Sequence, residues 1–164
     1  TAGILDVEIS QGYPGRRVHS TAAKQLALLV VVFSPVQMLA DLPENYMGKP
    51  EFQFLSDVPV NWEETRILNG AIGQYITTVR KDINSEDWYL GSITNEAARD
   101  LEISLSFLDA EATYQAQIYE DAEGTDYQNN PSRVSIRTQQ VTADDKMILK
   151  LAASGGTAIR FKKL

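Results

Sequence analysis

The pattern of hydrophobic and polar residues changes near residue 60 and divides the chain into two parts. In the second part, apolar and polar residues alternate over short stretches, most clearly over residues 101–107. A period of two is typical of strands with one buried face. The pattern predicts eight strands, near residues 64–69, 73–82, 87–94, 101–107, 114–119, 133–137, 147–151 and 159–162. We therefore expect an antiparallel eight-stranded β-sandwich over residues 61–164, with one face of each strand buried and the other facing water.

The first part has a different pattern, which begins with a long apolar segment. We expect a helix over residues 22–33, capped by the residues just before it and ended by Pro35, which disfavours helix at Ser34. The segment is apolar almost all round after Leu26, so the helix must be buried on several sides. Its eight-residue apolar core is much shorter than the roughly 20 residues of a membrane span, so we predict no membrane association.

Two further elements follow this helix. The short apolar run Val36–Ala40 predicts a buried strand, and residues 51–57 predict a helix that starts after Pro50. Helix, buried strand and helix in succession are typical of α/β domains. The chain starts without a visible signal peptide, and Gly3–Ile9 resembles the interior of a domain, so we expect a piece of a longer protein.

Composition narrows the possible functions. The chain has 164 residues and a net charge of −7, which argues against binding to nucleic acids. It has no cysteine, which excludes disulfides, thiolate metal sites and cysteine nucleophiles. His19 is the single histidine and precedes the first helix, so we interpret it as a surface or locally hydrogen-bonded residue.

Several segments resemble family-97 glycoside hydrolases. They are Lys24–Leu28, Ser34–Tyr46, Phe52–Val60 and Trp62–Arg66, followed in the same order by Arg80-Lys81, Trp88–Ile93, Ile118–Asp121, Asn130-Pro131 and Gly155-Gly156. The resemblance covers nearly the whole chain. Members of this family are bacterial α-glucosidases and α-galactosidases with an N-terminal sandwich, a catalytic (β/α)8 barrel and a C-terminal sandwich.

The resemblance implies that the chain is the C-terminal part of such an exo-acting enzyme. Residues 1–60 would be the end of the barrel, with residues 36–40 as its eighth strand, and residues 61–164 the C-terminal sandwich. The family depends on calcium, but its glutamate ligands and its catalytic carboxylates lie upstream of Thr1. We therefore expect no catalytic residue and no metal ligand here, an inactive fragment, and a parent enzyme that is periplasmic or exported.

Asp41 is the nearest candidate for a sugar contact. It follows the predicted eighth strand, and the carboxyl ends of barrel strands carry the active site. The alternative, which we prefer, is a turn or capping aspartate before Leu42-Pro43. Glu44 could lie at the rim of the site or on the surface.

Other acidic residues are weaker candidates. Glu63 and Glu64 are adjacent on a predicted strand and would point to opposite faces, so we interpret them as surface charges. The acidic loop Asp121–Asp126 could bind calcium, but it lacks the length and the final glutamate of a twelve-residue calcium loop. We prefer a plain turn between strands.

Four aromatic residues could stack on sugars, which would make the sandwich a carbohydrate-binding module. They are Trp62, Trp88, Tyr89 and Tyr119. We prefer positions in the core and at a domain interface, with Trp88 and Tyr89 on opposite faces of their strand. A purely structural or interaction domain is a third possibility. Without a barrel, the apolar helix over residues 22–33 should pack on the sandwich, join a second chain as a homo-oligomer, or be disordered.

Overall fold

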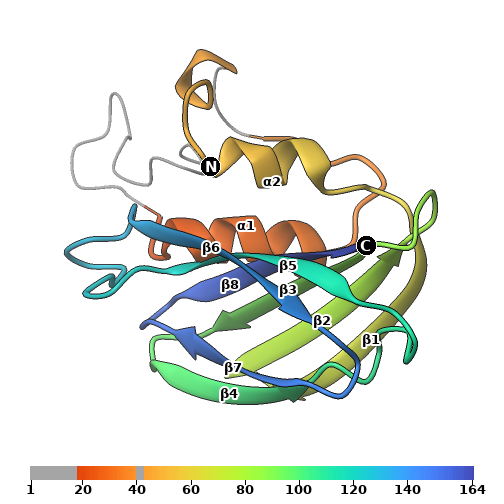
Figure 1. Ribbon diagram of the computed structural model, residues 1–164. Coiled ribbons are helices and arrows are strands. Elements are labelled where there is room, and N and C mark those ends of the chain that lie inside the picture. Colours follow the sequence, from red (N-terminus) through yellow and green to blue (C-terminus); the bar gives the residue numbers. More distant parts are fainter. Residues whose placement is uncertain (1–17, 40–42) are drawn as a thin grey trace.

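The computed structural model describes residues 18–39 and 43–164 and contains a β-sandwich with helices on one side (Figure 1). A six-stranded antiparallel sheet has the order β1-β2-β3-β8-β5-β6, and a two-stranded sheet pairs β4 with β7. The helices are α1 (Ala22–Val31), the 3-10 helix η1 (Pro43–Asn45) and α2 (Phe52–Asp57). The strands are β1 (Trp62–Ala71), β2 (Tyr75–Asp82), β3 (Trp88–Thr94), β4 (Arg99–Ser104), β5 (Tyr114–Asp121), β6 (Val134–Val141), β7 (Lys146–Leu151) and β8 (Gly156–Lys163).

The sandwich confirms the eight strands predicted from alternation. The inward side chains of both sheets form one core that includes Leu90, Ile118, Leu149 and Phe161. In β7 the burial pattern alternates residue by residue, as expected for a sheet with one wet face. Some strands pair with partners that are distant in the sequence: β8 pairs with β3 on one side and with β5 on the other.

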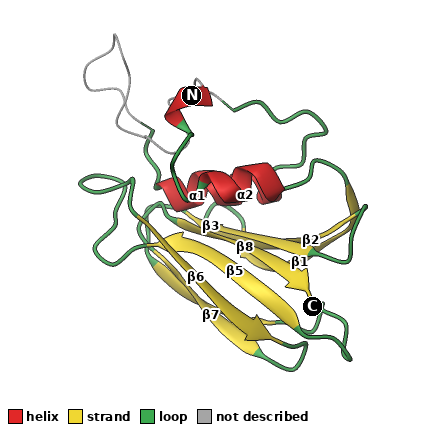
Figure 2. Ribbon diagram, turned by 45° about the horizontal axis from the view of Figure 1, so that its top comes forward, coloured by secondary structure: helices red, strands yellow, loops and turns green. Residues whose placement is uncertain are grey.

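The prediction of one wet face per strand is wrong for the centre of the large sheet. Most residues of β3 and β8 are buried on both faces, because the small sheet covers one face and the helices cover the other (Figure 2). Trp88 and Tyr89 illustrate this: Trp88 belongs to the sandwich core, whereas Tyr89 belongs to a second apolar cluster under the helices. Their predicted positions on opposite faces of the strand are confirmed.

Helix α1 packs directly on the large sheet, the first of the three outcomes considered for it. Its buried face contains Ala23, Leu26, Ala27 and Val30. The close approach needs glycine in the strands below, since a Cβ at Gly91 would lie 2.5 Å from the carbonyl oxygen of Ala27. A Cβ at Gly156 in β8 would likewise lie 2.7 Å from the Cα of Lys24.

The segment after α1 differs from the prediction. The helix ends at Val31 rather than Phe33, and the C-cap residue Val32 is extended. The predicted buried strand over residues 36–40 is wrong for residues 36–39, which form no strand and leave Val36 73% and Met38 88% exposed. A strand needs a neighbour to satisfy its backbone, and no described strand pairs with this segment. Ala40 lies outside the described residues.

The predicted helix after Pro50 is confirmed as α2, which buries Phe54. Phe54 makes edge contacts with Tyr89 and Tyr119, whose ring centroids lie 6.1 and 5.3 Å away. Both helices therefore share one apolar cluster on the large sheet. Over residues 18–39 and 43–164, no helix is long and apolar enough to cross a membrane.

Candidate functional site

The most distinctive chemistry in the described structure lies where the helices meet the sandwich. Arg80 in β2 is only 8% exposed and points to the C-terminal end of α1. Its Nε donates to the carbonyl of Val30 at 2.6 Å, and Nη1 donates to Thr65 Oγ1 at 2.8 Å. A cation at this end of a helix interacts favourably with the unpaired carbonyls and the helix dipole. Burial lowers the pKa of Arg80.

Arg160 in β8 joins α2 to the large sheet. Its Nη1 lies 2.7 Å from Asp57 Oδ2 at the end of α2. Its Nε and Nη2 donate to Asp87 Oδ2 at 3.0 and 2.9 Å. The hydroxyl of Tyr89 also donates to the backbone carbonyl of Asp57 at 2.8 Å. Burial is the main reason that the pKa of Tyr89 is raised.

The N-terminal end of α1 is held by several loops of the sandwich. The Thr21 hydroxyl caps the helix by accepting from the backbone N–H of Lys24. The Lys24 ammonium donates to the carbonyl of Thr94 at 2.7 Å, and burial lowers its pKa. The backbone N–H of Thr21 donates to the carbonyl of Ser154, a residue with φ of 52°. Ser154 in turn donates from its hydroxyl to the carbonyl of His19.

Asp121 completes this end of the junction from the last position of β5. One carboxylate oxygen accepts from the backbone N–H groups of Ala152 and Gly156, at 2.9 and 3.0 Å. Burial raises the pKa of Asp121, and hydrogen bonds from Thr21, Ala152 and Gly156 oppose the increase. The carboxylate thus links the β7–β8 turn to the start of α1 through hydrogen bonds.

The adjacent carboxylates of Glu63 and Glu64, both among the described residues, pair with separate cations. Asp41 lies outside the described residues. Glu63 forms an ion pair with Lys81, and Glu64 with Arg66, and both glutamates are about half exposed. Glu44 is exposed. Glu63 and Glu64 are surface charges, in agreement with our interpretation.

The acidic loop after β5 is a turn. Asp126 Oδ1 accepts from the backbone N–H groups of Gln128 and Asn129, at 2.6 and 2.8 Å. Residues 18–39 and 43–164 contain no group of three or more His, Asp or Glu side chains that could hold a metal ion. The histidine, His19, is exposed.

The aromatic residues considered for sugar stacking are mostly inside the protein. Trp88, Tyr89 and Tyr119 are at most 2% exposed, and Trp62 is half-buried against Tyr89. They occupy the sandwich core and the helix–sheet interface. The predicted burial is confirmed, and the predicted domain interface stays a prediction. Burial raises the pKa of Tyr119 to about 12.

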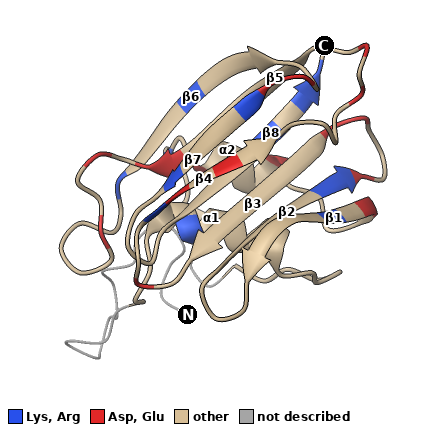
Figure 3. Cartoon of the chain, turned by 90° about the horizontal axis from the view of Figure 1, so that it is seen from below, with Lys and Arg blue, Asp and Glu red and all other residues tan. Residues whose placement is uncertain are grey.

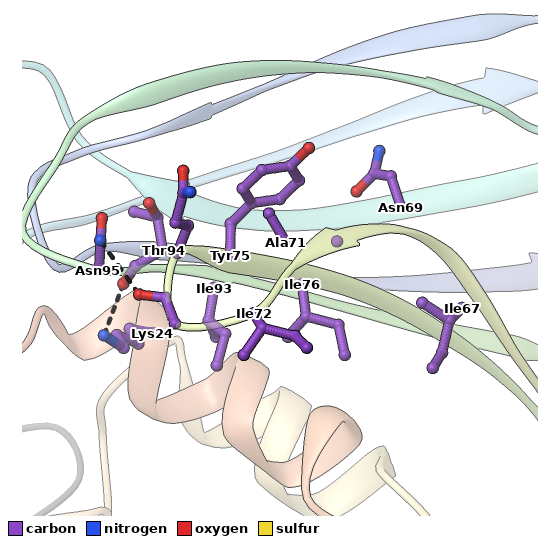
Figure 4. A pocket seen from close by; sticks show the side chains of 13 residues that line it. Lys24, Ile67, Asn69, Ala71, Ile72, Tyr75, Ile76, Ile93, Thr94 and Asn95 are labelled. Carbon is purple, nitrogen blue, oxygen red and sulfur yellow. Dashed lines mark hydrogen bonds between the residues drawn. The ribbon is translucent and has the colours of Figure 1, made fainter.

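A groove flanks α1 on the side of the first two strands, with a volume of about 590 Å³. We call it the β1–β2 groove. Its apolar wall consists of Ile67, Ile72, Ile76 and Ile93, and Lys24 closes one end. Figure 4 shows these isoleucines on the side of the hairpin that faces α1.

Sequence reasoning missed the roles of Arg80 and Arg160. Both arginines interrupt apolar strands, which is the one local signal that their side chains are enclosed. Their partners lie far away in the chain, 50 residues for Arg80 and Val30 and 73 for Arg160 and Asp87, so the sequence pattern could not identify them.

Comparison with known proteins places these features in a family context. Residues 61–162 match the family model described as "Glycosyl-hydrolase 97 C-terminal, oligomerisation". A retaining alpha-galactosidase from Bacteroides thetaiotaomicron is 37% identical over 150 residues, which are 88% of this chain and 21% of that protein. A probable retaining alpha-galactosidase from Streptomyces bingchenggensis is 32% identical over 93 residues, 56% of this chain and 14% of that protein.

Solved structures show the same relationship. A Glycoside Hydrolase Family 97 enzyme from Pseudoalteromonas sp., in complex with acarbose, superposes with a TM-score of 0.87 at 51% identity. The match covers 90% of this chain and 23% of that chain. A beta-arabinopyranosidase shares the fold with a TM-score of 0.76 at 23% identity, covering 96% of this chain and 24% of that one. The chain thus spans about a fifth of the length of the first curated relative.

Proposed function

This chain belongs to glycoside hydrolase family 97 and contains its C-terminal domain, and we propose that it works as the C-terminal part of an exo-acting α-glycosidase. The complete enzyme would hydrolyse α-linked glucosides or galactosides. Support comes from the similarity to a retaining alpha-galactosidase and to a family-97 enzyme in complex with acarbose. The sandwich would contribute support for the catalytic part rather than reacting groups.

The observation that carries this proposal is the way the sandwich grips helices from outside the matched region. Residues before 61 are not part of the family match, yet α1 and α2 are fastened to the sheet by Arg80 and Arg160. A buried guanidinium that satisfies helix carbonyls fixes both the position and the direction of the helix. This is the arrangement expected of a scaffold that orients a neighbouring catalytic domain.

A comparison of turnover by two proteins tests the proposal. The 164-residue chain should not hydrolyse aryl α-glucosides or α-galactosides, because glycoside hydrolysis needs two carboxyl groups across the bond. The longer polypeptide that carries it should hydrolyse one or both. Variants Glu63→Gln and Glu64→Gln in the longer polypeptide serve as controls that leave turnover unchanged. Stoichiometric turnover by the chain alone, persisting through purification, would contradict the scaffold role.

The proposed enzyme also depends on calcium and is exported from the cytoplasm. Calcium would be bound by glutamates of the catalytic part, and the protein would act in the periplasm or outside the cell. Addition of a calcium chelator should then abolish turnover of the longer polypeptide while leaving the thermal unfolding midpoint of the 164-residue chain unchanged. A chelator that lowers the midpoint of the chain would assign calcium ligands to this part.

We also propose that copies of the enzyme associate, a role supported by the family description, which names oligomerisation. The apolar helix predicted for this purpose packs its main apolar face on the sheet, and among the described residues two exposed apolar side chains follow its C-terminal end. Val32 and Phe33 there are 56% and 58% exposed. Light scattering of the wild-type chain and of Phe33→Glu tests whether this end contributes. Equal masses for the two proteins would exclude it.

A further inference from the structure

The β1–β2 groove is a second helix-sized site on the face of the large sheet that α1 already occupies. A six-stranded sheet is about 24 Å wide at a spacing of about 4.8 Å between strands. A helix with its side chains is about 10–12 Å across, so one helix covers at most about half of such a face. Among the described residues, α1 lies mainly over β3 and β8, which leaves the hairpin end of β1 and β2 open on this face.

The open part of the sheet is lined by apolar side chains, although it is exposed to solvent. Ile67 is 65% exposed and Ile72 is fully exposed, while Ile76 and Ile93 are half-buried cross-strand partners. Residues 67–79 carry no charged side chain, although 23% of the chain is charged. Figure 3 shows the contrast: the hairpin end of β1 and β2 is free of charges, whereas the other end of these strands carries acidic and basic residues. Loss of charge around exposed apolar residues marks interaction surfaces.

The groove continues an interface that is already formed. Lys24 belongs to α1 and closes the groove, and Ile93 lies both in the groove and against the apolar cluster under α1. A segment placed in the groove would therefore lie beside α1 in the same layer. Since α1 comes from outside the matched C-terminal domain, this face of the sheet already receives helices from that part of the chain.

We propose that the β1–β2 groove binds an amphipathic helix from the catalytic part of the same polypeptide, packed beside α1. The inference rests on the proposed function, because it needs a longer polypeptide, of which relatives have about four fifths outside the matched region. Isoleucine-lined grooves accept the apolar face of a helix, read at spacings of three and four residues. Ile72 at the hairpin tip is fully exposed, so such docking would bury more of this side chain than of the other isoleucines.

Amide hydrogen exchange of residues 67–76 tests this inference in the 164-residue chain and in the longer polypeptide. Exchange should be at least about tenfold slower in the longer polypeptide, at every protein concentration, because a docked helix must leave before the hairpin opens. Equal exchange in the two proteins would overturn the inference. Protection that appears in the chain alone and grows with concentration, with a dimer mass by light scattering, would also overturn it and assign the groove to a second copy.

A matched pair of variants gives a second measurement. Ile72→Lys should leave the unfolding midpoint of the 164-residue chain unchanged but lower that of the longer polypeptide. Ile148→Lys on β7, where Ile148 is 57% exposed on the small sheet, should change neither. Turnover is a separate readout: an active enzyme with an unprotected hairpin refutes only the groove, and an inactive protein with a protected hairpin refutes only the proposed activity.

Discussion

Replacement of Arg160 by methionine should destabilise the chain strongly, because this arginine links α2 to the large sheet. The variant removes the contact with Asp57 at 2.7 Å and two hydrogen bonds to Asp87. It leaves two carboxylates whose side chains are only 19% and 11% exposed. Removing one partner of a buried ion pair typically costs about 3–5 kcal/mol. Because water still reaches part of this network, we expect a loss of about 2–4 kcal/mol in the free energy of unfolding.

Urea denaturation followed by tryptophan fluorescence measures this loss, since Trp88 is adjacent to Asp87 and buried in the core. A loss of about 3 kcal/mol corresponds to a midpoint about 6–12 °C lower on heating, for a chain of this length. Lys146→Met is the control, because Lys146 and its partner Glu102 are both well exposed, at 67% and 62%. It should lose less than about 1 kcal/mol.

The double variant Arg160→Met with Asp87→Asn separates charge from packing. Without the negative charge at residue 87, part of the lost stability should return, because one unpaired carboxylate has been removed. If Arg160→Met is no more harmful than Lys146→Met, the network does not hold α2 to the sheet, and the reasoning behind the scaffold role fails.

Three further predictions concern packing, pH and sugar binding. Gly156→Ala should lower the free energy of unfolding by about 1–3 kcal/mol and loosen α1, because the new Cβ would lie 2.7 Å from the Cα of Lys24. The control is Gly70→Ala, where the nearest atom to the new Cβ is 3.3 Å away. In urea denaturation this control should lose less stability than Gly156→Ala. The pKa of Tyr119 is raised to about 12, so its contribution to stability is present below about pH 10 and lost as the pH rises toward 12; Tyr119→Phe should flatten this decline in urea denaturation, and an unchanged decline would contradict the assignment. Maltose-type and galactose-type oligosaccharides should leave tryptophan fluorescence unchanged, because Trp88 is 2% exposed, and quenching lost on replacing Trp88 would revive the carbohydrate-binding alternative.

The sequence predicted those features that depend on neighbouring residues. Alternation located all eight strands, and it placed Trp88 and Tyr89 on opposite faces, because side-chain direction follows from backbone geometry alone. The strand over residues 36–40 was predicted wrongly for the opposite reason. An apolar run becomes a strand only when another strand pairs with it, and the partner is not visible in the local pattern.

The candidate site was predictable only in part. Glu63 and Glu64 were correctly interpreted as surface charges from their adjacency on a strand. The roles of Arg80 and Arg160 could not be predicted, because their partners are helix ends that only the fold brings close to them. Asp41 stays a prediction, because it lies outside the described residues.

Strand β3 has a consequence for how this protein could be divided. Its side chains alternate between two separate apolar cores, with Trp88 in one and Tyr89 in the other. Unfolding of either core would expose the side chains on one face of β3 to water. The two layers should therefore unfold as a single cooperative unit. Residue 61 is therefore the edge of a recognisable sequence family but not of a transplantable module. A sandwich cut there and grafted onto another protein would need replacement helices, or new polar residues, on the face left bare.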